Sequence, residues 1–127
     1  MSSEWQSRAL SLLRLMTGLV LLQYGLQKMF GLIPGGPIQQ QSFGTLIWFA
    51  GAVELLGGAL LTVGLFTRCA AFVVSGQMAF AYFIGHAGRA FFPLLNGGGL
   101  AIILCFGCLY LAAAGGGSIS LDARRNA

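Results

Sequence analysis

Charged side chains are scarce in this sequence: they make up 8% of its 127 residues, against 57% hydrophobic residues. A water-soluble domain carries roughly 25% charged residues, so a chain with so few charges cannot cover its surface in water. Apolar segments recur from Leu12 to Ala114 with only short polar interruptions. The composition therefore excludes a soluble fold and indicates one membrane domain over residues 1–127.

Residues that carry soluble-type catalysis are also few. The chain has one histidine, His86, and three acidic residues, and it lacks a glycine-rich phosphate loop, an HExxH motif and paired carboxylates, which excludes kinase-type and hydrolase-type chemistry. One histidine is too few for a metal centre, so we expect no metal site. The three cysteines, Cys69, Cys105 and Cys108, lie in apolar stretches, which argues against a secreted disulfide framework.

Four apolar segments have about the length that a bilayer requires, since a hydrocarbon core of about 30 Å needs about 20 residues of helix. They cover residues 8–30, 45–64, 69–85 and 94–114. Between the first two, Pro34, Gly35 and a run of glutamines break the helix. The sequence predicts an all-α membrane protein, a bundle of four transmembrane helices, while a three-span alternative with one re-entrant segment stays open.

Basic residues divide unequally between the two ends of such a bundle. With four spans, one side holds Arg8, Arg14, Arg68, Arg124 and Arg125, and the other holds Lys28 and Arg89. The positive-inside rule then places both termini in the cytoplasm. Because the basic residues are spread singly along the chain, we expect no nucleic-acid partner.

Small residues recur on one face of the predicted helices, because residues three, four or seven apart share a face. Arg14, Gly18, Gly25 and Lys28 share a face in the first span, as do Gly51, Glu54 and Gly58 in the second and Gly98, Ala101, Cys105, Cys108 and Ala112 in the fourth. Small residues let membrane helices approach closely. The charged residues are therefore predicted to lie where helices pack.

Two polar layers follow from the rise of about 1.5 Å per residue. This rise places one group of residues about 9–15 Å from the cytoplasmic helix ends, near mid-membrane: Arg14, Glu54, Gln77 and Cys105. Glu54 and Arg14 are thus the candidate catalytic residues, and their depths allow an ion pair. That pair either fixes the helix register or supplies a proton-accepting or ligand-orienting group.

The second predicted layer, at the outer end, contains Lys28, His86, Arg89 and Asn96. These residues are candidates for the mouth of a ligand site, although Lys28 and Arg89 could also reach to lipid headgroups. The Cys105 and Cys108 pair has CxxC spacing, but it lies in an apolar helix without a flanking charge, which favours a packing role over a redox one.

Four segments of the chain, in this order, resemble patterns of the DoxX family of bacterial membrane proteins. They are Leu12-Leu-Arg14 with Gly25-Leu-Gln-Lys28, Glu54-Leu-Leu-Gly-Gly58 continuing through Gly64-Leu-Phe-Thr-Arg68, Phe92-Pro93 with Asn96-Gly-Gly, and Gly117-Ser-Ile-Ser-Leu-Asp122. The resemblance implies a four-helix bundle in the bacterial inner membrane. It also implies a link to membrane redox complexes, including the small-subunit type of a thiosulfate:quinone oxidoreductase.

Four polar residues of the chain match the motifs of the family, and two positions differ from them. Arg14, Lys28, Glu54 and Asn96 match their motif positions, whereas Tyr24 stands where many members have histidine, and Gly99 stands where they often have glutamate. A proton relay built on those two groups is therefore not implied for this chain.

The leading functional hypothesis is an inner-membrane subunit of a redox-linked complex that binds a quinone or another small apolar ligand within the bundle. Glu54 and Arg14 would polarise or protonate the ligand, because a buried carboxylate can deliver protons to a dry site. The expected ligand-binding residues are Lys28, Tyr24, Gln77, Arg89 and Asn96. The rival hypothesis is a non-enzymatic assembly, chaperone or transport-type subunit. Either subunit would work as a homo-oligomer or with a partner redox subunit.

Overall fold

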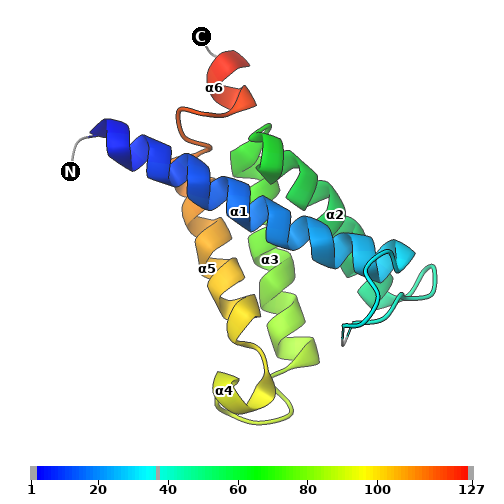
Figure 1. Ribbon diagram of the computed structural model, residues 1–127. Coiled ribbons are helices and arrows are strands. Elements are labelled where there is room, and N and C mark those ends of the chain that lie inside the picture. The colour runs from blue at the N-terminus through cyan, green and yellow to red at the C-terminus, as the bar shows by residue number, and fades with distance from the viewer. Residues whose placement is uncertain (1–2, 37, 126–127) are drawn as a thin grey trace.

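A computed structural model of the chain describes residues 3–36 and 38–125, and every regular element within those ranges is a helix. The helices are α1 (Ser3–Phe30), α2 (Leu46–Val63), α3 (Thr67–Gly85), α4 (Pro93–Asn96), α5 (Gly99–Ala114) and α6 (Leu121–Arg125). Figure 1 shows their arrangement. The domain expected over residues 1–127 includes residues 1–2, 37 and 126–127, which lie outside the described ranges.

Three of the described helices, α1, α2 and α3, are long and apolar enough to cross a membrane. The fourth expected span, residues 94–114, is not one helix: Gly97 has a φ of 75°, which only glycine adopts readily, and it separates α4 from α5. With 16 residues, α5 is about 24 Å long. The expectation of four full-length spans is therefore confirmed for three helices and corrected for the fourth.

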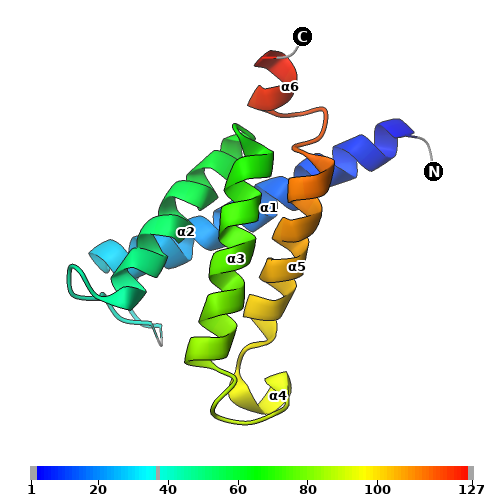
Figure 2. The ribbon, with the colours of Figure 1, turned by 180° about the vertical axis from the view of Figure 1, so that it is seen from behind.

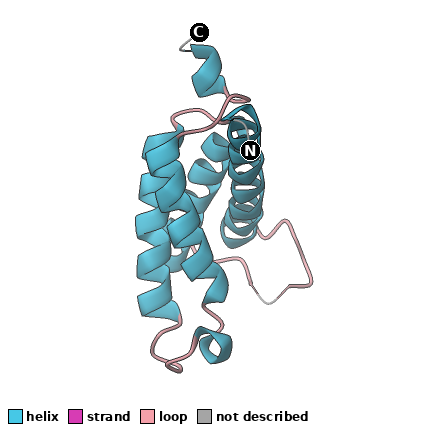
Figure 3. Ribbon diagram, turned by 90° about the vertical axis from the view of Figure 1, so that its left-hand side faces the viewer, coloured by secondary structure: helices cyan, strands magenta, loops and turns pink. Residues whose placement is uncertain are grey.

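The long helices form two antiparallel hairpins. Helix α1 packs most extensively on α2, and α3 packs most extensively on α5. The two hairpins join at the tight turn between α2 and α3, from which these helices diverge (Figure 2). Both ends of the described chain lie at the same end of the bundle as this turn (Figure 3). Helix α1 crosses the other helices obliquely.

Glycines bring α1 and α2 into backbone contact. A Cβ atom added to Gly18 would lie 2.5 Å from the backbone nitrogen of Thr62, and one added to Gly25 would lie 2.5 Å from that of Leu55. Real side chains do not approach so closely, so the helices meet only because these positions lack a Cβ. The predicted packing role of the small residues on α1 and α2 is confirmed.

The α3–α5 hairpin packs through side chains. Val74, Met78, Leu104 and Cys108 belong to its buried apolar core, and the hydroxyl of Ser75 donates a hydrogen bond to the Cys105 carbonyl at 2.7 Å. The predicted stripe on the fourth span does face this core, where Cys108 is buried and Ala101, Cys105 and Ala112 pack against it.

Candidate functional site

A buried ion pair joins α1 to α2. The Nζ atom of Lys28 lies 2.9 Å from both carboxylate oxygens of Glu54. The side chain of Glu54 is 3% exposed and that of Lys28 is 16% exposed. Lys28 lies over Gly51, where an added Cβ would come within 2.7 Å of the lysine Cβ. Glycine at that position therefore gives the lysine room to turn inward and reach the carboxylate.

The ion pair predicted between Arg14 and Glu54 is wrong. The antiparallel contacts set Gly25 against Leu55 and Gly18 against Thr62, so Arg14 reaches Gly64 and Lys28 reaches Glu54. Glu54 and Gly64 are ten residues apart, or about 15 Å along α2. The depth count failed because it set residue 8 level with the end of α2, whereas the contacts set Arg14 there and α1 crosses the bundle obliquely.

Arg14 instead binds the closing segment, which we define as residues 115–122. Its Nη1 atom donates to the carbonyl oxygens of Gly116 at 3.1 Å and Ile119 at 2.8 Å. The residue is 4% exposed. Ser11, one turn earlier on α1, donates to the Gly116 carbonyl and accepts a bond from the Ile119 amide. This arginine therefore fastens the C-terminal part of the chain to α1.

Asn96 organises the loop between α3 and α5. Its amide group donates to the Tyr82 hydroxyl at 3.0 Å and to the Ala90 carbonyl at 3.1 Å, while its side-chain oxygen accepts from the Gly98 amide at 2.8 Å. The Nδ1 atom of His86 lies 3.0 Å from the Asn96 carbonyl oxygen. Asn96 is 1% exposed, and protein groups satisfy both of its amide hydrogens.

The predicted outer layer is thus only partly assembled. His86 and Asn96 are in contact, and Arg89 is an exposed residue of the same loop. Lys28 does not join them, because its ammonium group is held by Glu54 on the other hairpin.

Tyr24 lies beside the ion pair, and Gln77 is a half-buried residue of α3. The ring of Tyr24 lies 5.9 Å from Nζ of Lys28, within cation–π range. Gln77 follows Thr67 by ten residues and Glu54 precedes Gly64 by ten, so both stand at one level above the α2–α3 turn. Its buried Oε1 atom has no hydrogen-bond partner among the described residues. By residue count, this unpaired amide oxygen lies about as far along α3 from the turn as Glu54 lies along α2.

Sequence reasoning missed the role of Asp122. Its two carboxylate oxygens accept hydrogen bonds from the backbone amides of Phe66 and Thr67, both at 2.8 Å, and so cap the start of α3. Burial by itself would raise the pKa of Asp122, but the hydrogen bonds from Thr67 and Phe66 and the charge of Arg125 outweigh it, and the pKa is lowered. The sequence does contain a signal for this cap. Phe66, at the N-cap position of α3, has no side-chain acceptor, so the first amides of α3 need an acceptor from another part of the chain.

Chemically, the candidate site offers one carboxylate and one ammonium group between two glycine-packed helices. The lysine has three N–H donors, and Glu54 engages it through two oxygens, which leaves it able to donate to a ligand oxygen. The described residues contain no cluster of three or more histidine, cysteine or acidic side chains that could hold a metal ion. Cys105 and Cys108 are both free thiols.

The helical architecture and the apolar length of α1, α2 and α3 define the chain as an integral membrane protein. The family model for DoxX matches residues 9–87, which is more than half of the chain. The chain therefore belongs to the DoxX family, as the sequence motifs predicted. The matched region contains Arg14, Lys28, Glu54 and Gln77, whereas Asn96 lies beyond it.

A protein of Haemophilus influenzae described as uncharacterized is 45% identical to this chain over 80 residues. That alignment covers 61% of this chain and 60% of the relative's own length, so it reaches less than two thirds of either protein. No solved structure matches the chain.

Proposed function

We propose that the protein is a membrane subunit of a redox-linked complex in the bacterial inner membrane, and that it binds a quinone or another small apolar ligand beside Lys28 and Glu54. The buried ion pair is the observation that carries this proposal. An ionisable side chain costs about 2.5–3.5 kcal/mol on insertion scales at the centre of a membrane helix, and such residues mark functional sites by default. Buried ion pairs, moreover, are often no more stabilising than apolar residues of similar volume.

The groups around the pair suit a ligand that carries carbonyl oxygens. The third N–H of Lys28 can donate to one such oxygen, and the amide of Gln77, whose oxygen is unpaired, can turn its N–H groups toward another. The ring of Tyr24 adds an aromatic surface beside the ammonium group. In this arrangement Lys28 lies beside Glu54, where the sequence predicted Arg14.

The reaction that such a site supports is reduction of the quinone to the quinol, which consumes two electrons and two protons. The electrons would come from a partner redox subunit. Glu54, in its protonated form, can transfer the first proton to one quinone oxygen and be reprotonated from the aqueous side, while Lys28 stabilises negative charge that develops on that oxygen. The second proton, for the other quinone oxygen, comes from the aqueous side.

The test is the quinone content of protein purified in mild detergent and extracted with organic solvent. Wild type and Gln23→Met, which alters an exposed position of α1, should both carry quinone well above the level of protein-free micelles. Lys28→Met and Glu54→Gln should retain the helical circular dichroism of wild type. Both variants should lose most of the bound quinone. A wild type at the micelle background would refute the ligand, and equal quinone content in all variants would refute the site.

We also propose that α5 crosses the membrane with the other three helices, so that both termini are cytoplasmic. The support is that Arg8, Arg68 and Arg124 belong to the start of α1, the start of α3 and to α6, the elements at the end of the bundle where the described chain begins and ends. In a variant without native cysteines, an impermeant thiol reagent should label a cysteine at Gly36 in intact cells and leave one at residue 127 unlabelled. Residue 127 lies outside the described ranges. The reverse pattern would overturn this orientation.

One observation favours a second candidate, a non-enzymatic assembly or transport-type subunit. Arg14, Asn96 and Asp122 direct most of their hydrogen bonds to backbone groups that hold one element on another, which is the work of a scaffold. The double variant Lys28→Met with Glu54→Leu separates the two functions. Both kinds of subunit should keep the partner through that change. Only a quinone-binding subunit should lose quinone relative to wild type.

A further inference from the structure

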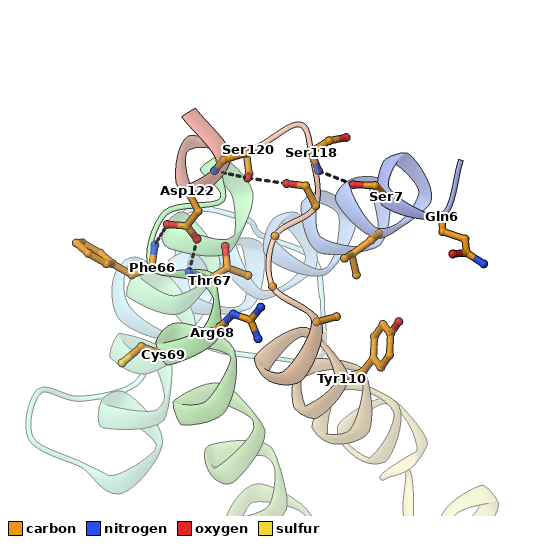
Figure 4. A pocket seen from close by; sticks show the side chains of 16 residues that line it. Gln6, Ser7, Phe66, Thr67, Arg68, Cys69, Tyr110, Ser118, Ser120 and Asp122 are labelled. Atoms are coloured by element: carbon orange, nitrogen blue, oxygen red, sulfur yellow. Dashed lines mark hydrogen bonds between the residues drawn. The ribbon is translucent and has the colours of Figure 1, made fainter. Parts of the chain in front are cut away.

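A cavity of about 750 Å³ lies at the end of the bundle where the chain begins and ends, well away from Lys28 and Glu54. It is an open pocket lined by the first turns of α1, the start of α3, the end of α5 and the closing segment. Figure 4 shows Arg68, Tyr110 and Ser7 among the side chains that line it. The segments that form it come from both ends of the sequence, so the cavity exists only in the folded chain.

Arg68 supplies a positive charge in this cavity that is only partly used. Its Nη1 atom donates to the carbonyl oxygens of Ala112 and Ala113 in the last turn of α5, which holds the guanidinium in place. The group lies against Gly115, where an added Cβ would be 3.3 Å from Nη2. The Nε and Nη2 atoms make no hydrogen bond with other described residues. Arg68 therefore presents a fixed, unused donor edge.

The acidic side chains nearby do not neutralise this edge. Both oxygens of Asp122 accept from backbone amides at the start of α3, and its nearest cationic contact is Arg125 at 3.8 Å. Glu4 is paired with Arg8 at 2.6 Å. Among the described residues, neither carboxylate forms an ion pair with Arg68, so the donor edge of its guanidinium is free to bind an anion.

We propose that this cavity binds a phosphate oxyanion through Arg68. A guanidinium matches the spacing of phosphate oxygens and forms charge-assisted bonds with them. The hydroxyl of Ser7 accepts a bond from the Ser118 amide, so its own proton is free to donate, and Tyr110 adds a second hydroxyl. The site is separate from the ion pair and does not depend on the proposed quinone function.

Two sources could supply the phosphate: the headgroup of a membrane phospholipid or a soluble phosphate. The apolar side chains of Leu10 and Phe66 that line the same cavity fit the glycerol and first acyl carbons of a lipid. The cavity also lies where α3 begins and α5 ends, which is the level of the headgroups in the proposed membrane orientation.

The experiment measures binding to purified full-length protein in neutral detergent by native mass spectrometry and by the shift in thermal unfolding temperature. The three probes are dioleoylphosphatidylglycerol, dioleoylglycerol, which lacks the phosphate, and inorganic phosphate, which lacks the acyl chains. Wild type should bind phosphatidylglycerol and not dioleoylglycerol. Binding of inorganic phosphate at similar concentrations would identify a soluble ligand, whereas its failure beside strong lipid binding would identify the headgroup.

Variants assign the binding to Arg68. Arg68→Gln should weaken phosphatidylglycerol binding by about 10-fold to 100-fold, the loss expected for one charge-assisted hydrogen bond, and Arg68→Lys should recover part of it. Arg89→Gln, an exposed arginine after the other end of α3, should bind like wild type. Equal binding of the lipid that lacks phosphate, or equal losses in Arg68→Gln and Arg89→Gln, would overturn the proposal.

A measurement on the wild type tests the same site even if Arg68→Gln does not fold. Raising the salt concentration toward 1 M shortens the Debye length to about 3 Å and should weaken phosphatidylglycerol binding several-fold. Affinity that is independent of salt would mean that the guanidinium does not hold the ligand, and it would refute the site.

Discussion

The two hairpins solve the problem of membrane packing in different ways. Where α1 meets α2, Gly18 and Gly25 leave no room for a Cβ atom, and the backbones touch. In the α3–α5 hairpin, Gly76 and Gly107 have nothing within 4 Å of an added Cβ, and the helices meet through side chains. Gly18 and Gly25 are thus required for the contact between α1 and α2, whereas Gly76 and Gly107 take no part in the contact between α3 and α5.

The hairpins differ in charge as well. The buried ion pair of Lys28 and Glu54 belongs to the glycine-packed hairpin, whereas Ser75 contributes an uncharged hydrogen bond between α3 and α5. Close backbones leave two long side chains little freedom, so they are held in one arrangement at a low entropic cost. The candidate site therefore belongs to the first hairpin, at the contact between α1 and α2.

The largest expected effect comes from breaking the ion pair. Glu54→Gln should lower the free energy of unfolding by about 3–5 kcal/mol, because Lys28 is left charged, buried and unpaired. The double variant Lys28→Met with Glu54→Leu should recover most of the loss. Unfolding by sodium dodecyl sulfate in mixed micelles measures both, and a Glu54→Gln protein as stable as wild type would show that the pair does not form.

Adding a methyl group to the glycine contact should have the next largest effect. Gly25→Ala should cost about 1–3 kcal/mol because the Cβ would overlap the backbone of Leu55. Gly76→Ala and Gly107→Ala are the matched controls in the other hairpin, and each should change stability by about 0.5 kcal/mol or less. The same micelle assay applies, and similar losses in all three variants would remove the contrast between the hairpins.

The link between the hairpins should be weaker and sensitive to acid. Asp122→Ala removes the cap of α3 and should cost about 1–2 kcal/mol. The folded pKa of Asp122 is lowered, so its contribution is complete above its unfolded pKa of about 3.9 and is lost as the pH falls through the folded value.

Thermal unfolding in detergent between pH 7 and pH 3 measures this loss. The stability advantage of wild type over Asp122→Asn should be constant above about pH 5 and shrink below about pH 4. An advantage that grows as the pH falls would contradict the assigned role of the carboxylate.

The smallest effect belongs to the α3–α5 contact. Ser75→Ala removes a hydrogen bond between membrane helices, and such bonds contribute about 0.6 kcal/mol on average. The Cys105 carbonyl keeps its place in the helix after the change, which limits the loss. A cost above about 2 kcal/mol in the micelle assay would show that this hairpin, too, depends on a polar contact.

Much of the architecture could be read from residue order alone. Apolar length predicted α1, α2 and α3, because only a helix of about 20 residues satisfies its backbone across a bilayer. Spacing along a helix also placed Glu54 and Lys28 on the glycine stripes where α1 and α2 pack. The motifs identified the DoxX family, which the match over residues 9–87 confirms.

Partnerships between helices could not be read in this way. The register of α1 on α2 depends on how α1 is tilted and on how far it extends past α2, and an error of about two helical turns exchanged Lys28 for Arg14 as the partner of Glu54. Likewise, Asp122 caps a helix that begins 55 residues earlier. Periodicity specifies which face of a helix is inward, but only the packed backbones decide which residues meet there.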